Sequence, residues 1–166
     1  EKDLLETGGG VKNALDKLGD EPFFVMNSDA MILNGSLVAL KRLAERWNPD
    51  EMDALLLLHS TVEAYGYDGT GDFEMDPLGK ISRKEERQIA PYLFTGIQIL
   101  HPKVFENTPE GPFSLNVIYT KLIEQGRLYG IDHDGEWFHV GTPEGLAQAE
   151  SYMGVRYSGS RRRRII

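Results

Sequence analysis

Hydrophobic residues along the chain follow two different spacings. Short apolar runs of strand length occupy residues 22–27, 53–59 and 92–100. The second run contains four consecutive leucines, which is typical of a strand covered on both faces, as in a parallel sheet. Residues 36–47 and 113–125 instead repeat apolar side chains three or four positions apart, which predicts amphipathic helices. Strands that alternate with helices in this way predict a doubly wound α/β layout.

Shorter signals mark where elements begin, turn and end. Ser36 is the expected N-cap of the first amphipathic helix, and Pro49 ends that helix because proline restricts the residue before it. Residues 73–75 and 80–82 are expected to pair as a short hairpin across the turn at residues 76–79.

A second hairpin is expected near the C-terminus. Asp134-Gly135 is a strong two-residue turn signal, and it predicts that strands at residues 127–133 and 136–140 pair with each other. The turn also accounts for the acidic residues around it, so no metal is assigned there. Thr142 as cap and Pro143 in the first turn predict the start of the last helix.

Three consecutive glycines, Gly8 to Gly10, precede an expected helix at residues 11–18. Glycine lets a ligand touch the main chain, and the first N–H groups of a helix lack partners within it. Such a turn is suited to hold a nucleotide or another anionic, planar ligand. The alternative is a flexible linker before an ordinary helix, because a lone glycine cluster is a weak signal.

Asp29 follows the apolar run at residues 22–27, and open α/β sheets bind ligands beyond the carboxyl ends of their strands. A carboxylate at that place can hold a divalent cation against phosphates. The alternative is a cap or turn residue, which is less favoured because Ser36 already supplies the cap. Gly96 interrupts the run at residues 92–100, as expected for a bulge or a close backbone approach.

Composition narrows the possible functions. The chain has 166 residues, enough for one domain, and a formal net charge of -8, which argues against nucleic-acid partners because those need a basic face. It contains no cysteine, which excludes disulfides and thiolate zinc sites and fits a reducing cytoplasm. No apolar run approaches the roughly 20 residues of a membrane span, so no membrane contact is expected.

Basic residues form two clusters. Arg83, Lys84 and Arg87 most simply form a solvated, charged loop. The alternative is that they supply a positive charge near a sugar phosphate, because arginine suits phosphate geometry. The four arginines at residues 161–164 predict a solvated basic tail over residues 154–166, with contact to an anion as the second interpretation.

Four motifs occur in a familiar order: Glu6-Thr7-Gly8-Gly9-Gly10, Asn27-Ser28-Asp29, Phe94-Thr95-Gly96 and Val140-Gly141-Thr142-Pro143-Glu144. In this order the chain resembles the sugar-1-phosphate nucleotidyltransferases over residues 5–150. Within that family it looks most like the N-acetylmuramate-1-phosphate uridylyltransferase and mannose-1-phosphate guanylyltransferase branches.

The resemblance implies a Rossmann-like nucleotidyltransferase domain with a mixed, mostly parallel sheet and helices on both faces. Its partners would be a nucleoside triphosphate, with UTP expected, and a sugar 1-phosphate, which react to give a nucleotide-sugar and pyrophosphate. The implied site residues are Glu6, Thr7, Gly8 and Gly9 for the nucleotide, Thr95, Gly96, Asn116 and Arg83 for the sugar phosphate, and Asp29 with His139 for a metal.

The implied metal is Mg²⁺, with Asp29 as the catalytic carboxylate. The family usually places a second metal-binding aspartate where this chain has His139. Either His139 leaves the metal to Asp29, phosphate oxygens and water, or it binds the metal and shifts the preference toward Mn²⁺.

The resemblance further implies an earlier βαβ region whose glycine-rich loop, with Arg and Lys, grips the triphosphate. We therefore expect residues 1–153 to be the C-terminal portion of a nucleotidyltransferase domain that is inactive alone. It would self-associate or pack against the missing N-terminal part, because its sheet would have an unpaired edge. The alternative is a non-catalytic nucleotide- or sugar-binding module, such as a regulatory paralogue.

Overall fold

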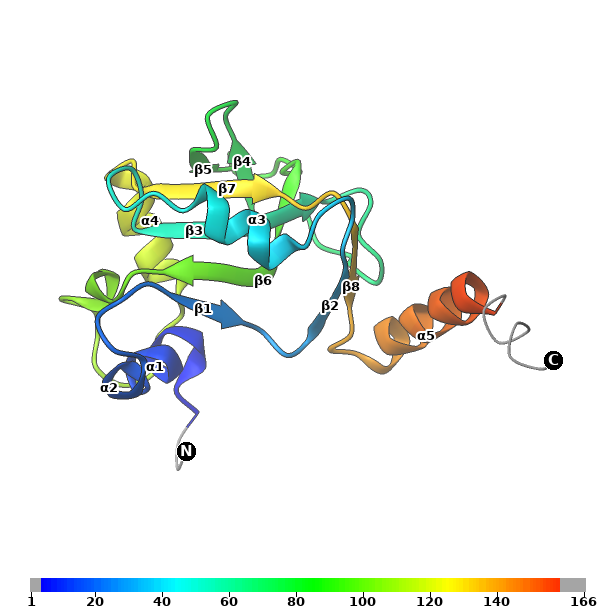
Figure 1. Cartoon of the computed structure of the whole chain (residues 1–166), viewed down its shortest axis with the longest axis horizontal. Coiled ribbons are helices and arrows are strands. Elements are labelled where there is room, and N and C mark those ends of the chain that lie inside the picture. The colour runs from blue at the N-terminus through cyan, green and yellow to red at the C-terminus, as the bar shows by residue number, and fades with distance from the viewer. Residues whose placement is uncertain (1–3, 159–166) are drawn as a thin grey trace.

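The computed structural model describes residues 4–158, most of which surround a six-stranded sheet (Figure 1). Its strands are β1 (Phe23–Met26), β3 (Ala54–Ser60), β4 (Phe73–Met75), β5 (Ile81–Arg83), β6 (Tyr92–Leu100) and β7 (Leu128–Asp132). The order is β5-β4-β6-β3-β7, and β1 pairs with the C-terminal end of β6. The sheet is mixed, as predicted, but only β3 and β7 are parallel. The other four strand pairs are antiparallel, because β6 runs against β1, β3 and β4 and β5 returns along β4, so the expectation of a mostly parallel sheet is wrong.

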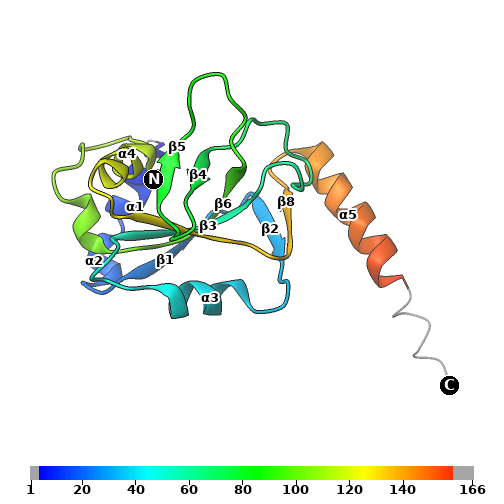
Figure 2. The same ribbon diagram turned by 90° about the horizontal axis from the view of Figure 1, so that it is seen from above.

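Helices cover both faces of this sheet, which also confirms the prediction (Figure 2). The helices are α1 (Glu6–Lys12), α2 (Leu15–Leu18), α3 (Ala39–Arg46), the 3₁₀ turn η1 (Pro102–Phe105), α4 (Asn116–Glu124) and α5 (Pro143–Tyr157). On β3, Leu56 and Leu58 belong to the core under α4, whereas Leu55 and Leu57 belong to the core under α3. Successive residues of a strand face opposite sides, so the leucine run supplies both cores.

A second sheet of two strands stands beside the first. β2 (Ala30–Leu33) pairs antiparallel with β8 (Glu136–His139), and Ala30 lies opposite His139. α5 follows and extends away from the body of the domain (Figure 1). The Oγ1 atom of Thr142 accepts the N–H of Gly145 at 3.1 Å, which confirms the expected cap.

α5 continues through residue 153, where we expected the domain to end, and reaches Tyr157. The arginines at residues 161–164 lie outside the described residues. Between residues 4 and 158, no helix is both long enough and apolar enough to cross a membrane.

The hairpin expected at Asp134-Gly135 is wrong, because β7 and β8 belong to different sheets. Non-local contacts redirect the chain at this turn. The Asp134 carboxylate accepts hydrogen bonds from the N–H and hydroxyl of Ser36 and pairs with Arg42. A side chain at Gly135 would come within 1.9 Å of the Leu33 carbonyl oxygen, so only glycine allows this close approach to the end of β2. The other hairpin, between β4 and β5, is confirmed.

The cap predicted at Ser36 is also wrong. α3 begins at Ala39, whose N–H is accepted by the Oδ1 atom of Asn34 at 2.8 Å. Ser36 is instead committed to Asp134, as described above. The sequence argument that Ser36 makes a turn role for Asp29 less favoured therefore does not hold. The end of this helix before Pro49 is confirmed.

The glycine run does not form a loop before a helix, so that prediction is wrong. Helix α1 begins at Glu6 and contains the glycines, and α2 is a separate short helix. The N–H groups of Gly8 and Gly9 both donate to the carbonyl oxygen of Phe113, at 2.8 and 3.1 Å. A Cβ atom at Gly8 would lie 2.4 Å from the Phe113 ring. These glycines thus allow α1 to pack closely against the segment before α4.

β1 forms where we expected a strand, but it is not buried on both faces. Phe24 is 43% exposed and Met26 is 55% exposed. Among the described strands, β1 pairs with β6 and leaves its other edge free. It is an edge strand with an apolar exposed face, which agrees with the expected unpaired edge.

Candidate functional site

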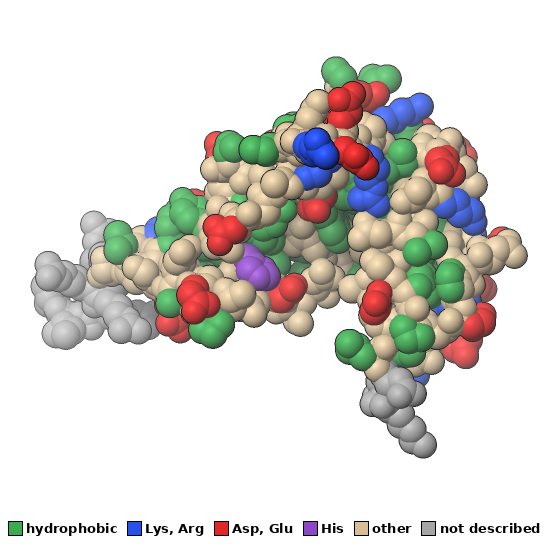
Figure 3. All heavy atoms as spheres, turned by 180° about the vertical axis from the view of Figure 1, so that it is seen from behind, with side chains coloured by type: hydrophobic (Ala, Val, Ile, Leu, Met, Phe, Trp, Pro, Cys, Tyr) green, Lys and Arg blue, Asp and Glu red, His purple; other side chains and the backbone are tan. Residues whose placement is uncertain are grey.

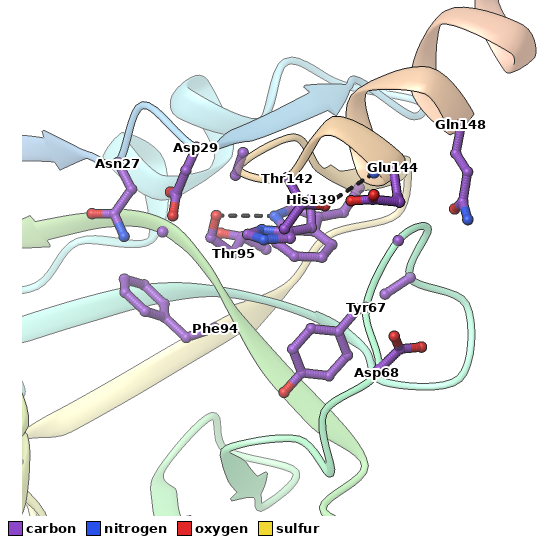
Figure 4. A pocket seen from close by; sticks show the side chains of 16 residues that line it. Asn27, Asp29, Tyr67, Asp68, Phe94, Thr95, His139, Thr142, Glu144 and Gln148 are labelled. Carbon is purple, nitrogen blue, oxygen red and sulfur yellow. Dashed lines mark hydrogen bonds between the residues drawn. The ribbon is translucent and has the colours of Figure 1, made fainter.

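A pocket of about 740 Å³ opens where the two sheets meet (Figure 4). Five segments that are distant in sequence form its wall: the turn after β1, the loop at residues 64–68, the middle of β6, strand β8 and the start of α5. The side chains that define it are Asn27, Asp29, Tyr67, Asp68, Phe94, Thr95, Trp137, His139, Thr142, Glu144 and Gln148. Figure 3 shows a hollow on this side of the molecule, with a histidine and acidic side chains near its border.

Asp29 and His139 share one corner of the pocket. Asp29 precedes β2, and its carbonyl oxygen accepts the N–H of Val140 at 2.9 Å, just after β8. A Cβ atom at Gly141 would lie 2.8 Å from the Cε1 atom of His139 and 3.1 Å from the Cβ atom of Asp29. Glycine at this position therefore keeps the space between the two side chains open. The structure thus brings Asp29 and His139 to one corner of the pocket, and their role in holding a metal stays a prediction.

Thr95 and Gly96 reach the same pocket from β6. Gly96 has φ of 87°, a left-handed conformation that favours glycine, and the pairing of β3 with β6 shifts register here, as expected for a bulge. The Gly96 carbonyl oxygen accepts the N–H of Asn27 at 2.9 Å. Thr95 is fully buried and its hydroxyl donates to the Leu57 carbonyl oxygen at 2.7 Å. Its hydroxyl is thus engaged with the main chain of β3.

The remaining predicted site residues lie outside this pocket. Arg83 donates to the Oδ1 atom of Asn116 at 2.8 Å, so these two residues meet each other but not Asp29. The Arg83 guanidinium lies 4.8 Å from the centre of the Phe73 ring, and burial lowers the pKa of this arginine. Their contact with a sugar phosphate stays a prediction.

The predicted nucleotide residues are likewise apart from the pocket. Glu6, Thr7, Gly8 and Gly9 lie in helix α1, and the Oγ1 atom of Thr7 accepts the N–H of Leu115 at 3.2 Å. The contacts that the structure shows for this segment join α1 to the segment before α4 and hold the fold together. A role in binding a nucleotide remains a prediction.

Sequence reasoning missed several residues of the pocket. Tyr67 lies in the loop at residues 64–68; its hydroxyl accepts the N–H of Gly71 at 3.2 Å, and burial raises the pKa of its phenol. Trp137 could have been found from its position, because it lies two residues before His139 and alternate strand residues share a face. Glu144 stands in the fourth motif but was given no role, and Asp68 carried no recognisable signal.

The charge of the pocket is negative. Asp29, Asp68 and Glu144 line it, whereas none of the residues that line it is lysine or arginine. The part of the chain that the structure describes has no group of three or more His, Asp or Glu side chains arranged to hold a metal. Asp29 and His139 would offer one oxygen and one nitrogen. The carboxylate suits Mg²⁺, which takes most of its other ligands from phosphates and water, whereas the imidazole suits a softer transition metal.

Comparison with known sequences identifies relatives. No model of a protein family matches the chain. It is 39% identical to the N-acetylmuramate alpha-1-phosphate uridylyltransferase of Caulobacter vibrioides, over 90% of this chain and 62% of that protein. The protein of the same name from Neisseria meningitidis is 30% identical, with 91% and 63% covered. A mannose-1-phosphate guanyltransferase of Candida albicans is 29% identical, with 87% and 40% covered. The chain therefore spans less than two thirds of the length of these relatives.

Solved structures show the same fold. A UDP-glucose pyrophosphorylase complexed with UDP-glucose superposes with a TM-score of 0.71 at 16% identity, over 93% of this chain and 64% of that one. A putative glucose-1-phosphate thymidylyltransferase from Bacillus anthracis superposes with a TM-score of 0.70 at 20% identity, over 90% and 62%. The Rossmann-like nucleotidyltransferase fold predicted from the sequence is confirmed. Over 90% of its length, the chain is a homologue of part of the sugar-1-phosphate nucleotidyltransferases, the family that its motifs indicated.

Proposed function

We propose that this chain forms the sugar-phosphate side of a nucleotidyltransferase that joins a nucleoside triphosphate to a sugar 1-phosphate and releases pyrophosphate. The observation that supports this proposal most is that Asp29, His139 and the Thr95-Gly96 backbone line one and the same pocket. Two relatives are named uridylyltransferases, which supports UTP as the triphosphate. The absence of cysteine agrees with a cytoplasmic location.

In this reaction an oxygen of the sugar phosphate attacks the α-phosphorus of the nucleotide, and the bond to pyrophosphate breaks. Such a transfer needs no covalent intermediate with the protein. It depends on aligning the two phosphates and on stabilising the negative charge of the phosphate oxygens. When bound, Mg²⁺ would supply positive charge to the phosphate oxygens. Asp29 would hold that cation, and His139 would donate a hydrogen bond to a phosphate oxygen or to a water beside it. Gly141 leaves room for the phosphate between them.

The other end of the pocket suits a sugar ring. There Tyr67 provides apolar surface, and Asp68 and Gln148 provide acceptors for hydroxyl groups (Figure 4). We assign the sugar to this end because the phosphate belongs beside Asp29. Whether the sugar is N-acetylmuramate or mannose is left to the experiment below.

We further propose that the chain alone is inactive. A triphosphate needs several cationic groups, and electrostatic stabilisation is usually the largest catalytic contribution. No lysine or arginine lines the pocket. The groups that grip the triphosphate would lie in the part of the relatives that this chain does not span.

The test is an assay for pyrophosphate release with UTP or GTP, each paired with N-acetylmuramate 1-phosphate or mannose 1-phosphate. The chain itself and the longest natural protein that contains it are compared. We expect release from the longer protein, with UTP preferred, and none from the chain alone. Binding of a sugar phosphate without turnover in either form would instead indicate the non-catalytic binding module.

A further inference from the structure

Trp137 joins the two sheets at the wall of the pocket. Its indole N–H donates to the carbonyl oxygen of Thr95 at 3.0 Å. The indole is only 4% exposed and Thr95 is fully buried. Because the Thr95 hydroxyl is in turn bonded to Leu57, a chain of hydrogen bonds leads from β8 through the bulge of β6 to β3. Trp137 therefore fixes β8 to the main sheet at the level of the pocket.

The same indole lies against His139. The two residues are two positions apart on β8 and share one face of it. Their ring centres are 6.2 Å apart and their planes differ by 19°, a distance within the range of aromatic contacts. Tyr67 packs its ring at 82° to the indole, with centres 5.9 Å apart. The imidazole thus lies beside a ring that is held by a hydrogen bond and by a second aromatic contact.

Backbone contacts alone leave the imidazole free to turn. The backbone of β8 is held by pairing with β2 and by the bond from the His139 N–H to the Tyr65 carbonyl oxygen. These bonds set the path of the strand, whereas the direction of the side chain depends on its own torsions. A neighbouring ring that cannot move restricts those torsions.

We propose that Trp137 is a positioning residue, which orients His139 toward the space that His139 shares with Asp29. This inference rests on the proposed function, in which that space receives a phosphate and a cation. Residues that orient a ligand-binding side chain can change the affinity for the ligand strongly, although they do not touch the ligand themselves. Trp137 would act through its indole N–H and its flat ring together.

The experiment measures binding to the chain by calorimetry, with Mg²⁺ present and with N-acetylmuramate 1-phosphate or mannose 1-phosphate as the probe, whichever binds more tightly. Trp137→Phe keeps an aromatic ring and removes the N–H. We expect its dissociation constant to rise about 10-fold, because His139 would no longer be oriented toward the phosphate; removing partners that orient metal ligands has effects of this order. Trp47→Phe, in a separate apolar pocket beside Phe24, is the matched control and should bind as wild type does.

A double-mutant cycle with His139→Ala separates positioning from a general structural loss. If Trp137 acts through the imidazole, Trp137→Phe should cost little further affinity once the imidazole is absent. An equal loss with and without His139, or no loss at all, would overturn the inference while leaving the proposed function intact. Failure of the wild-type chain to bind either sugar phosphate would count against the proposed function itself, and against this inference with it. Should Trp137→Phe not fold, Trp137→Tyr is measured in its place.

Discussion

The Nε2 atom of His133 lies 3.1 Å from the carbonyl oxygen of Leu33, and this contact joins the end of β7 to the end of β2. His133 is 3% exposed, and its ring centre lies 6.0 Å from that of His59. Burial, with a smaller contribution from His59, lowers the pKa of the His133 imidazole. The folded protein therefore binds a proton at this site more weakly than the unfolded chain does, so acid favours unfolding.

We expect the free energy of unfolding to fall as the pH drops below about 6.5, the ordinary value for histidine. Asp132 acts in the opposite direction, because burial raises the pKa of its carboxyl and its protonation favours the folded state. Urea unfolding of wild type and His133→Gln at a series of pH values isolates the histidine. The variant should lose less stability on acidification, and an identical pH dependence would contradict the assignment.

A substitution at Gly8 tests the packing of α1. Gly8→Ala places a methyl group 2.4 Å from the Phe113 ring and 2.7 Å from its carbonyl oxygen. Overpacking of this kind destabilises by about 1–3 kcal/mol. Gly154→Ala in α5 is the control, because nothing lies within 4 Å of its added methyl group. That variant should gain up to about 1 kcal/mol from helix propensity. Thermal unfolding of both variants measures these changes in stability. A Gly8→Ala variant as stable as wild type would refute the packing role of Gly8.

The sequence predicted those parts of the fold that depend on local pattern. The leucines from Leu55 to Leu58, the bulge at Gly96 and the cap at Thr142 all appeared as expected. The errors share one cause, which is contact between residues far apart in the chain. Gly8 packs against Phe113, and Gly135 approaches the Leu33 carbonyl oxygen closely and does not form the predicted hairpin turn. Such partners have no signature in the sequence around either residue.

The candidate site divides in the same way. Asp29 and Gly96 were predicted because each stands in a motif, and His139 because it holds the position of the family's second aspartate, just before the fourth motif. Trp137 and Tyr67 were missed because their role arises from how β8 and the loop at residues 64–68 fold around β6. Arg83 and Asn116, both predicted to contact the sugar phosphate, lie beside each other but outside the pocket. The family motifs indicated which residues share a site, whereas the contacts of Trp137 and Tyr67 arise from tertiary packing that the motifs do not encode.

Exposed side chains on β1 predict self-association of the chain. Phe24 and Met26 extend along an edge strand whose outer side has no partner among residues 4–158. An exposed, apolar edge strand promotes pairing with another chain, and an inward or edge lysine suppresses it. Met26→Lys should therefore shift the chain toward monomer in light scattering, while Leu78→Lys, in the β4–β5 turn and 73% exposed, should leave association unchanged. A wild-type chain that is monomeric at all concentrations would disprove this prediction.

Asp29→Asn tests the cation-binding role in the longest natural protein that contains the chain. The amide keeps the shape of the carboxylate but removes the charge, so pyrophosphate release should fall about 100-fold or more, the usual effect of losing one stabilising group. Binding of the nucleotide base should persist, because the predicted base-binding segment in α1 is unchanged. Asp20→Asn, an exposed residue before β1, serves as the control. Turnover like that of wild type would show that Asp29 is only a turn residue.

The choice between two roles for His139 can be settled through metal preference. Mg²⁺ prefers oxygen ligands, whereas imidazole suits softer transition metals, and Asp29 is the carboxylate beside this imidazole. We expect His139 to leave the metal to Asp29, phosphate oxygens and water, because Mg²⁺ commonly binds through one or two carboxylates and phosphates. His139→Asp should then remain active with Mg²⁺, and His139→Ala should lose part of the activity together with a hydrogen bond to phosphate. Direct ligation predicts a Mn²⁺ optimum in wild type that disappears in His139→Asp. Pyrophosphate release by the longer protein and both variants, measured side by side with Mg²⁺ and Mn²⁺, distinguishes the two roles, and a Mn²⁺ optimum lost in His139→Asp would reverse our assignment.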